Sequence, residues 1–315
     1  MSDRAVFVVA LADAARNAAA KRAMQAQFPE AHIVSFPDCT DDKVLAKATA
    51  LLVWNPDPKL LALMPKLDFV QSYGAGVDHL LPYWDQLSRM SVARFVDPSL
   101  SENMSHYVIN QILNDQLHAT SYADQQRQSV WRPHVPREGN RVLVMGLGTI
   151  GQKVADDLLG LGYQVTGWSR TPKPHTGYPT LSGLDALQSS LAHMDYVVNI
   201  LPLTPDTRQL VNAHLMGKMT PDCCFINVGR GATVDTTALI GQLDQGLLRK
   251  AVLDVFEREP LAADHPAWLH PKLVLTPHIA SITNIEQVVA VFAENQRRRD
   301  NGKPILYGID MALGY

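Results

Sequence analysis

One strand–turn–helix unit restricts the possible folds of this chain more than any other feature. Residues 142–159, "VLVMGLGTIGQKVADDLL", place Gly146, Gly148 and Gly151 directly after an apolar, β-branched run and at the opening of an amphipathic segment. The first glycine permits a tight turn, the second lets the backbone approach a pyrophosphate, and the third allows close packing of helix on strand. This context favours a dinucleotide-binding βαβ unit over an ordinary glycine-rich turn.

Short β-branched runs alternate with segments of helical periodicity along the chain, which is typical of parallel sheets built from βαβ units. The expected strands are 5–10, 32–36, 50–54 and 69–72, and then 142–145, 164–168, 196–200, 223–228, 250–255 and 273–276. The expected helices include 101–120, 150–161, 236–245 and 284–299. Gly162 and Gly246 stand where two of these helices should end.

The fold class that we expect is α/β, with two doubly wound parallel-sheet domains. A Rossmann dinucleotide-binding domain over residues 101–284 is inserted into a flavodoxin-like substrate domain made of residues 1–100 and 285–315. The length of 315 residues is consistent with two domains that each have their own core.

Composition excludes several classes of protein. A net charge of -3 argues against nucleic acid as the main partner. No apolar run approaches the roughly 20 residues of a membrane span, so no membrane partner is expected. The three cysteines, of which Cys223 and Cys224 are adjacent, make no disulfide framework, and we therefore expect a cytoplasmic protein.

Three consecutive strands should deliver polar side chains to one edge of the central sheet. Arg230 lies between two glycines in "FINVGRGATVD", Glu257 and Glu259 follow the strand in "VLDVFEREP", and His278 follows Pro277 in "VLTPHIAS". Open α/β sheets bind ligands at the carboxyl ends of their strands, so the coincidence favours catalysis over separate structural roles. The residues alone leave both glutamates open. No metal site is expected, because the histidines lack ligand spacing.

Two further segments resemble ligand loops. In the first domain, "GAG" at Gly74, Ala75 and Gly76 follows a strand and offers backbone N–H groups to an anion, although by itself a simple turn would be the better explanation. After the strand at 164–168 the chain supplies Ser169, Arg170 and Lys173, where NAD-binding sites carry an acid. Positive charge at this point suits a 2′-phosphate and predicts NADPH rather than NADH.

Taken together, "GLGTIG", "LPLTPDTRQLVN", "NVGRGATVD", "LDVFEREPL" and "LTPHIAS" resemble the D-2-hydroxyacid dehydrogenases over essentially the whole chain. "VWNP" (53–56), "GAGVD" (74–78), "QQRQSVWRP" (125–133) and the terminal "GY" resemble the glyoxylate/hydroxypyruvate reductase branch. The resemblance implies a catalytic triad of Arg230, Glu259 and His278, because the family places its acid immediately before the proline. His106 departs from the pattern at a position where many relatives carry Glu.

Pattern and resemblance together imply the ligand contacts. The expected cofactor contacts are Gly146, Gly148, Thr149, Ile150, Gly151, Ser169, Arg170, Lys173, Leu201, Pro202, Val228, Gly229, Arg230, Asp254, His278 and Ala280. The expected substrate contacts are Trp54, Tyr73, Gly74, Ala75, Gly76, Arg230 and His278.

The function implied is NADPH-dependent reduction of a small 2-oxo acid, glyoxylate to glycolate or hydroxypyruvate to D-glycerate. Hydride reaches C2 while His278 gives a proton to the developing alkoxide. A reductase of larger acids (phenylpyruvate or a branched-chain analogue) and a dinucleotide-sensing regulator are the alternatives.

Apolar residues at helical spacing in segment 101–120 also predict a homodimer, unless that stripe packs on its own domain. The residues of the stripe are Met104, Tyr107, Val108, Ile112 and Leu113.

Overall fold

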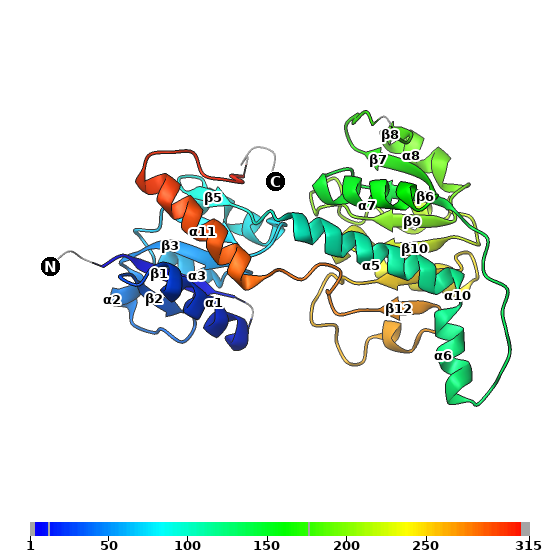
Figure 1. The fold of residues 1–315 in the computed structure, drawn as a ribbon, viewed down its shortest axis with the longest axis horizontal. Helices are drawn as coiled ribbons and strands as arrows, with labels where there is room; N and C mark the ends of the chain where they lie inside the picture. Colours follow the sequence, from blue (N-terminus) through cyan, green and yellow to red (C-terminus); the bar gives the residue numbers. More distant parts are fainter. Residues whose placement is uncertain (1–3, 12, 176, 310–315) are drawn as a thin grey trace. The chain divides into compact units, whose positions relative to one another are not determined.

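A computed structural model describes residues 4–11, 13–175 and 177–309. The described chain divides into two compact units (Figure 1). The first extends to Asp97 and resumes at Thr283, and the second runs from Pro98 to Ile282. The terminal Gly-Tyr pair of the sequence lies outside the described residues.

The first unit is built on a five-stranded parallel sheet with the strand order β2-β1-β3-β4-β5. Its strands are β1 (Val6–Ala10), β2 (His32–Ser35), β3 (Ala48–Val53), β4 (Phe69–Ser72) and β5 (Ser91–Ala93). Its helices are α1 (Ala14–Gln27), α2 (Asp42–Leu45), α3 (Pro58–Ala62), the 3₁₀ helix η1 (Asp78–Tyr83), α4 (Trp84–Leu87) and α11 (Ile285–Asp300). This order is the flavodoxin-like arrangement.

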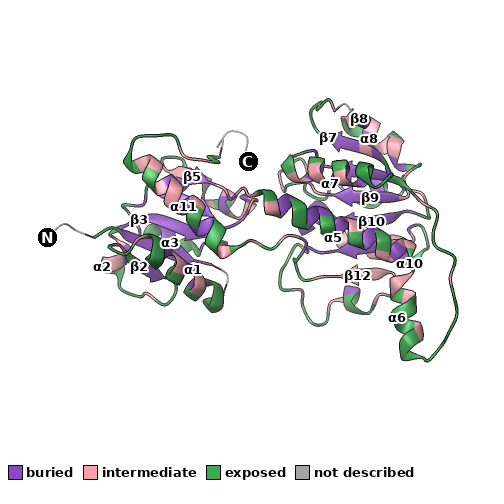
Figure 2. Ribbon diagram, viewed as in Figure 1, coloured by how far each residue is buried: buried purple, intermediate pink, exposed green. Residues whose placement is uncertain are grey.

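The core of the first unit explains how its two separate chain segments hold together. Phe292 of α11 packs edge-on against Phe7 of β1 and Phe28 at the end of α1. Near the C-terminus, Ile309 N–H donates to Val92 O (2.9 Å) beside β5. The strands themselves are almost continuously buried, as expected for a parallel sheet covered on both faces (Figure 2).

The second unit is built on a seven-stranded parallel sheet with the order β12-β11-β10-β9-β6-β7-β8. Its strands are β6 (Arg141–Met145), β7 (Gln164–Ser169), β8 (Thr180–Ser182), β9 (Tyr196–Asn199), β10 (Cys224–Asn227), β11 (Lys250–Leu253) and β12 (Leu273–Leu275). The strand order reverses between β6 and β9. Ligands of doubly wound sheets bind at this switch point.

The helices of the second unit connect these strands. They are α5 (Pro98–Gln116), α6 (Ala119–Arg127), α7 (Thr149–Gly160), α8 (Leu184–Leu191), α9 (Ala213–Met216), α10 (Thr236–Asp244) and the 3₁₀ helices η2 (Gly231–Thr233) and η3 (Pro266–Leu269). None of the helices in the described part of the chain is long and apolar enough to cross a membrane.

The predicted fold class of two parallel-sheet α/β domains is confirmed, with differences at short elements. β5 and β8 have three residues each and were not expected, because their sequences (Ser-Val-Ala and Thr-Leu-Ser) include polar residues and do not form an apolar, β-branched run like that of β12. The expected helix 101–120 is two helices, α5 and α6, separated where His118 adopts a left-handed conformation (φ 56°). Gly162 (φ 89°) and Gly246 (φ 72°) have the left-handed conformation expected after a helix end.

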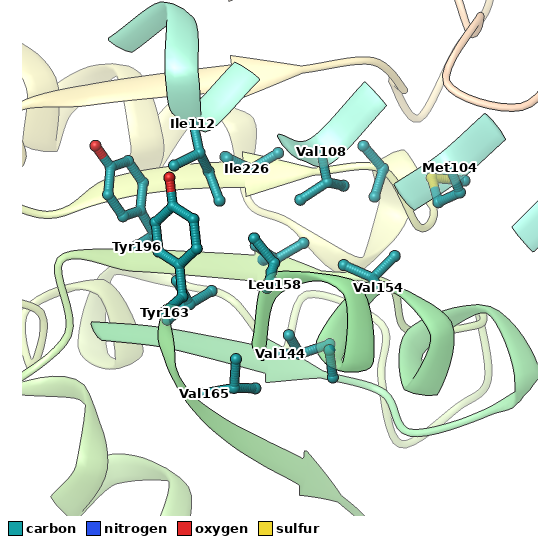
Figure 3. Packing of buried hydrophobic residues seen from close by; sticks show 14 of the residues in the cluster. Met104, Val108, Ile112, Val144, Val154, Leu158, Tyr163, Val165, Tyr196 and Ile226 are labelled. Carbon is teal, nitrogen blue, oxygen red and sulfur yellow. The ribbon is translucent and has the colours of Figure 1, made fainter. Parts of the chain in front are cut away.

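Most of the apolar stripe of α5 packs on its own unit, which was the alternative to a dimer surface, and the homodimer itself stays a prediction. Met104, Val108 and Ile112 are buried in the core of their own unit, where they face the β6–β10 sheet and α7 (Figure 3). Of the stripe, only Leu113 is an exposed large apolar side chain, at 41%. Helical periodicity reports that a face is buried, but it does not say what covers it.

Candidate active site

The glycine turn after β6 has three glycines in three different environments. Gly146 has φ 109°, and a Cβ there would lie 3.0 Å from Ile200 O at the end of β9. A Cβ on Gly151 would lie 1.7 Å from Gly146 O, so the turn and α7 touch backbone to backbone. A Cβ on Gly148 would meet nothing within 4 Å. The second glycine therefore borders open space at the N-terminus of α7.

That N-terminus has the properties of an anion site. Gly148 is the N-cap of the 12-residue helix α7, so Thr149 and Ile150 occupy the first turn. The N–H groups of a first helical turn have no acceptor within the helix, and the helix dipole adds partial positive charge. Lys173 brings a full charge close by, because its ammonium donates to Leu147 O (3.0 Å) inside the glycine turn.

The end of β7 carries the residues expected to select the cofactor. Ser169 is buried, and its hydroxyl donates to Thr171 O (2.7 Å). Arg170 is exposed and pairs with Asp206, which lies after β9, at 2.9 Å. Asp206 was not anticipated, because nothing in the sequence indicates which carboxylate will reach Arg170.

Two buried asparagines hold the ends of β9 and β10 together. Asn199 Nδ2 donates to Asn227 Oδ1 (3.0 Å) and to Thr233 Oγ1 (2.8 Å). Leu201 N–H donates to Asn199 Oδ1 (3.3 Å), and Gly229 N–H donates to Asn227 Oδ1 (3.2 Å). These bonds fix the ends of β9 and β10. The loops that follow carry the expected cofactor contacts Leu201, Pro202, Val228 and Gly229.

The remaining expected contacts at these ends are tightly packed. A Cβ on Gly229 would lie 2.6 Å from Leu201 O, so the two loops approach backbone to backbone. Val228 N–H donates to Asn199 O (3.0 Å), and Pro202 O accepts the Thr207 hydroxyl (2.7 Å).

Arg230 stands at the turn after β10. Its carbonyl accepts the Thr233 hydroxyl (2.6 Å), and its guanidinium donates to Gly229 O (2.9 Å). A Cβ on the next residue, Gly231, would lie 1.9 Å from the carbonyl carbon of Phe256. The loop after β11 therefore crosses directly over the Arg230 turn.

Glu259 and His278 meet at the same edge. His278 Nδ1–H donates to Glu259 Oε2 (2.7 Å), and Phe256 N–H donates to Glu259 Oε1 (2.9 Å). Burial acts to raise the pKa of Glu259, but these two hydrogen bonds and the charges of His278 and Arg230 outweigh it, so the pKa lies below its ordinary value. Glu257 instead pairs with Arg208 at 2.9 Å. Of the two candidate acids, Glu259 is the one that contacts the histidine.

The His278 loop depends on Asp254, the residue that follows β11 and is 1% exposed. The Asp254 carboxylate accepts the N–H groups of Ile279 (2.8 Å) and Ala280 (2.9 Å), and its carbonyl accepts His278 N–H (2.8 Å). His278 has a φ of 54°, a left-handed conformation that costs a non-glycine residue roughly 1–2 kcal/mol. The bonds to Asp254 offset that cost.

In the first unit, the expected substrate residues form a compact group of their own. The Ser72 hydroxyl lies within hydrogen-bond distance of the carbonyls of Gly74 (3.1 Å) and Gly76 (3.2 Å), which fixes the loop around Ala75. A Cβ on Gly74 would lie 2.7 Å from the Trp54 ring, so the indole rests on this glycine. The Tyr73 hydroxyl donates to Thr283 O (3.1 Å).

Among the described residues, no group of three histidine, cysteine or acidic side chains is arranged to hold a metal ion.

Comparison with known proteins places this arrangement in a family. Residues 109–280 match the model of the D-isomer specific 2-hydroxyacid dehydrogenase, NAD binding domain. Glyoxylate/hydroxypyruvate reductase A of Escherichia fergusonii is 32% identical over 93% of this chain and 95% of its own length.

Solved structures agree over nearly the whole chain. The NADPH-dependent glyoxylate/hydroxypyruvate reductase of Sinorhizobium meliloti, in complex with NADP and sulfate, has a TM-score of 0.90 at 32% identity and covers 99% of this chain and 100% of its own. A D-isomer specific 2-hydroxyacid dehydrogenase of Xanthobacter autotrophicus, in complex with NADPH and MES, has a TM-score of 0.87 at 36% identity and covers 100% of both chains. The chain belongs to the D-isomer specific 2-hydroxyacid dehydrogenase family.

Proposed function

We propose that the protein reduces a small 2-oxo acid with NADPH, converting glyoxylate to glycolate or hydroxypyruvate to D-glycerate. The observation that carries the proposal is the Glu259–His278 pair, held at the sheet edge beside the Arg230 turn. An ionised carboxylate bound to an imidazole is an arrangement suited to proton transfer. The relatives named for this reaction support the choice of substrate class.

The residues around the glycine turn fit a dinucleotide phosphate. Gly148 leaves room for a pyrophosphate in front of the α7 N-terminus, where backbone N–H groups bind anions. Arg170 and Lys173 offer two cations beside the end of β7, where a 2′-phosphate would be held, and Ser169 replaces the acid that would repel it. When bound, the reduced nicotinamide supplies the hydride.

The side chains of this chain then divide the remaining chemistry. Arg230 binds the carboxylate of the 2-oxo acid through its guanidinium. His278 donates a proton to the oxygen at C2 as negative charge develops there. Glu259 orients the ring and stabilises its charged form. Trp54 and the loop from Tyr73 to Gly76 remain predicted substrate contacts.

A panel of 2-oxo acids, followed through loss of NADPH absorbance, tests the proposal. We expect kcat/KM for glyoxylate or hydroxypyruvate to exceed that for phenylpyruvate and a branched-chain 2-oxo acid. A higher kcat/KM for either large acid would indicate a reductase of larger 2-oxo acids instead. No turnover of any acid, with NADPH binding intact, would favour a dinucleotide sensor.

We also propose a cytoplasmic homodimer. Cys39, Cys223 and Cys224 are free thiols, which suits a reducing compartment. Exposed apolar side chains gather on the end of α5, on α6 and on the chain that follows, and Trp131 is 99% exposed. Other members of this group are Leu113, Leu117, Tyr122, Val130 and Val135.

Exposed apolar groups of this extent mark interaction surfaces. Light scattering at micromolar concentration should give twice the 34.7 kDa of one chain, and Trp131→Ala should shift the mass toward a single chain. A wild-type mass of one chain would reject the dimer.

A further inference from the structure

A chain of two hydroxyl groups that have no expected role leads to the side chain of Asp254. Thr276 Oγ1 donates to Asp254 Oδ1 (2.6 Å), and the Tyr107 hydroxyl lies 2.5 Å from Thr276 Oγ1. A threonine hydroxyl has a single hydrogen, which here is given to the carboxylate. Tyr107 must therefore donate to Thr276, so the chain of hydrogen bonds runs in one direction, from α5 to Asp254.

We propose that Tyr107 and Thr276 are positioning residues that set the orientation of Asp254 and, through it, the His278 loop. Asp254 accepts hydrogen bonds from three consecutive N–H groups, those of residues 278, 279 and 280. Only two of these bonds use the carboxylate, and they form only when its plane is correctly oriented. The inference rests on the proposed role of His278 as the proton donor.

The surroundings of Asp254 make the orientation of its carboxylate important for the position of the His278 loop. Asp254 is buried, and bonds to an ionised acceptor in such surroundings are stronger than neutral ones. Burial raises the pKa of Tyr107 to about 12, although its bond to Thr276 acts in the other direction, so the hydroxyl remains a donor at any working pH. His278 itself is exposed and has a left-handed φ. The Ile279 and Ala280 N–H bonds to the Asp254 carboxylate therefore act together with the bonds that His278 makes to Asp254 O and Glu259 to hold it in place.

The test uses variants that remove one hydroxyl each. Tyr107→Phe and Thr276→Val delete the two donors, and Thr276→Ser restores the second. Tyr163→Phe is the matched control, because the Tyr163 hydroxyl donates to Gln116 Oε1 (2.8 Å) in the same core and has no link to Asp254. Hydrogen exchange of the peptide spanning residues 276–281 is measured in each protein without substrate.

We expect amide exchange in this peptide to quicken by about 2- to 12-fold in Tyr107→Phe, the loss of one ordinary hydrogen bond. Thr276→Val loses a bond to a charged acceptor, and amide exchange should quicken by about 10- to 150-fold. Thr276→Ser and Tyr163→Phe should exchange like the wild type. In turnover, Thr276→Val should lower kcat about fivefold or more, with the KM for the 2-oxo acid within about twofold.

Two results overturn the inference. Exchange of the 276–281 peptide that is unchanged in Thr276→Val, or that quickens equally in Tyr163→Phe, would show that the hydroxyl chain does not hold the loop. The exchange result does not depend on catalysis. If the wild type reduced no 2-oxo acid, the proposed function would fail while hydrogen exchange still decided whether Tyr107 and Thr276 position the loop.

Discussion

Substitution of the glycines of the β6–α7 turn by alanine should separate cofactor binding from fold stability. At Gly148 the added methyl meets open space, and the backbone (φ -76°) already suits an L-residue. Replacing a glycine N-cap by alanine lowers the free energy of unfolding by about 0.5–1 kcal/mol. The lower conformational entropy of the unfolded alanine chain raises it again by about 0.4–1 kcal/mol. The net change in the free energy of unfolding should be within about 0.5 kcal/mol.

The same methyl occupies the space proposed for the pyrophosphate. Forcing a methyl into a filled contact costs about 1–3 kcal/mol, so the Kd of Gly148→Ala for NADPH should rise roughly 5- to 150-fold.

Gly151→Ala should have the opposite effect, because it should lower the stability of the fold. Its Cβ would lie 1.7 Å from Gly146 O, a backbone atom that cannot rotate away, so α7 must move. We expect a loss of about 3 kcal/mol or more and a Tm lower by about 6–12 °C for a unit of this size.

Thermal unfolding without cofactor and fluorescence titration with NADPH measure the two effects. Gly160→Ala, where a Cβ meets nothing within 4 Å at the far end of the same helix, is the control and should match the wild type in Kd. Wild-type affinity in Gly148→Ala, or an unchanged Tm in Gly151→Ala, would refute the roles given to these glycines.

The remaining predictions concern the other parts of the site. Arg230→Gln should raise KM and lower kcat, with at least a tenfold loss of kcat/KM for glyoxylate (about 1.4 kcal/mol), and unchanged kinetics would remove Arg230 from the site. Arg170→Ala should weaken NADPH by about 1.5–3 kcal/mol and leave NADH nearly unchanged in parallel titrations, whereas equal losses would deny it a phosphate contact. Because the pKa of Glu259 lies below its ordinary value of 4.5, its carboxylate stays ionised at working pH, and the stability that it contributes is lost only as the pH falls through that lowered value. Glu259→Gln should therefore remove this acid-side loss of stability, as measured by a pH series of unfolding of the two proteins.

Much of the site was predictable, because each strand-end motif carries its own local signal. The glycine turn, Arg230 and His278 stand directly after buried strands, and parallel strands align their carboxyl ends at one edge. The choice of Glu259 over Glu257 needed the family resemblance. The two residues differ only in where the loop points them, which sequence spacing does not encode.

Contacts between distant segments were not predictable in the same way. Tyr107 and Thr276 lie 169 positions apart, and the helical spacing of Tyr107 indicated only that its face is buried. Asp206 reaches Arg170 across 36 positions. Such pairs depend on the tertiary fold, and no local pattern distinguishes them from other polar residues on loops.

Single-turnover hydride transfer in His278→Asn tests the central claim most directly. NADPH and glyoxylate are mixed with enzyme in excess, and the rate of NADPH loss is compared with that of the wild type at the same pH. Because asparagine keeps a polar side chain but cannot act as the acid, we predict a rate lower by about 100-fold or more, with the Kd for NADPH within about twofold. A rate equal to that of the wild type, or a defect confined to NADPH binding, would contradict the assignment of His278 as the proton donor.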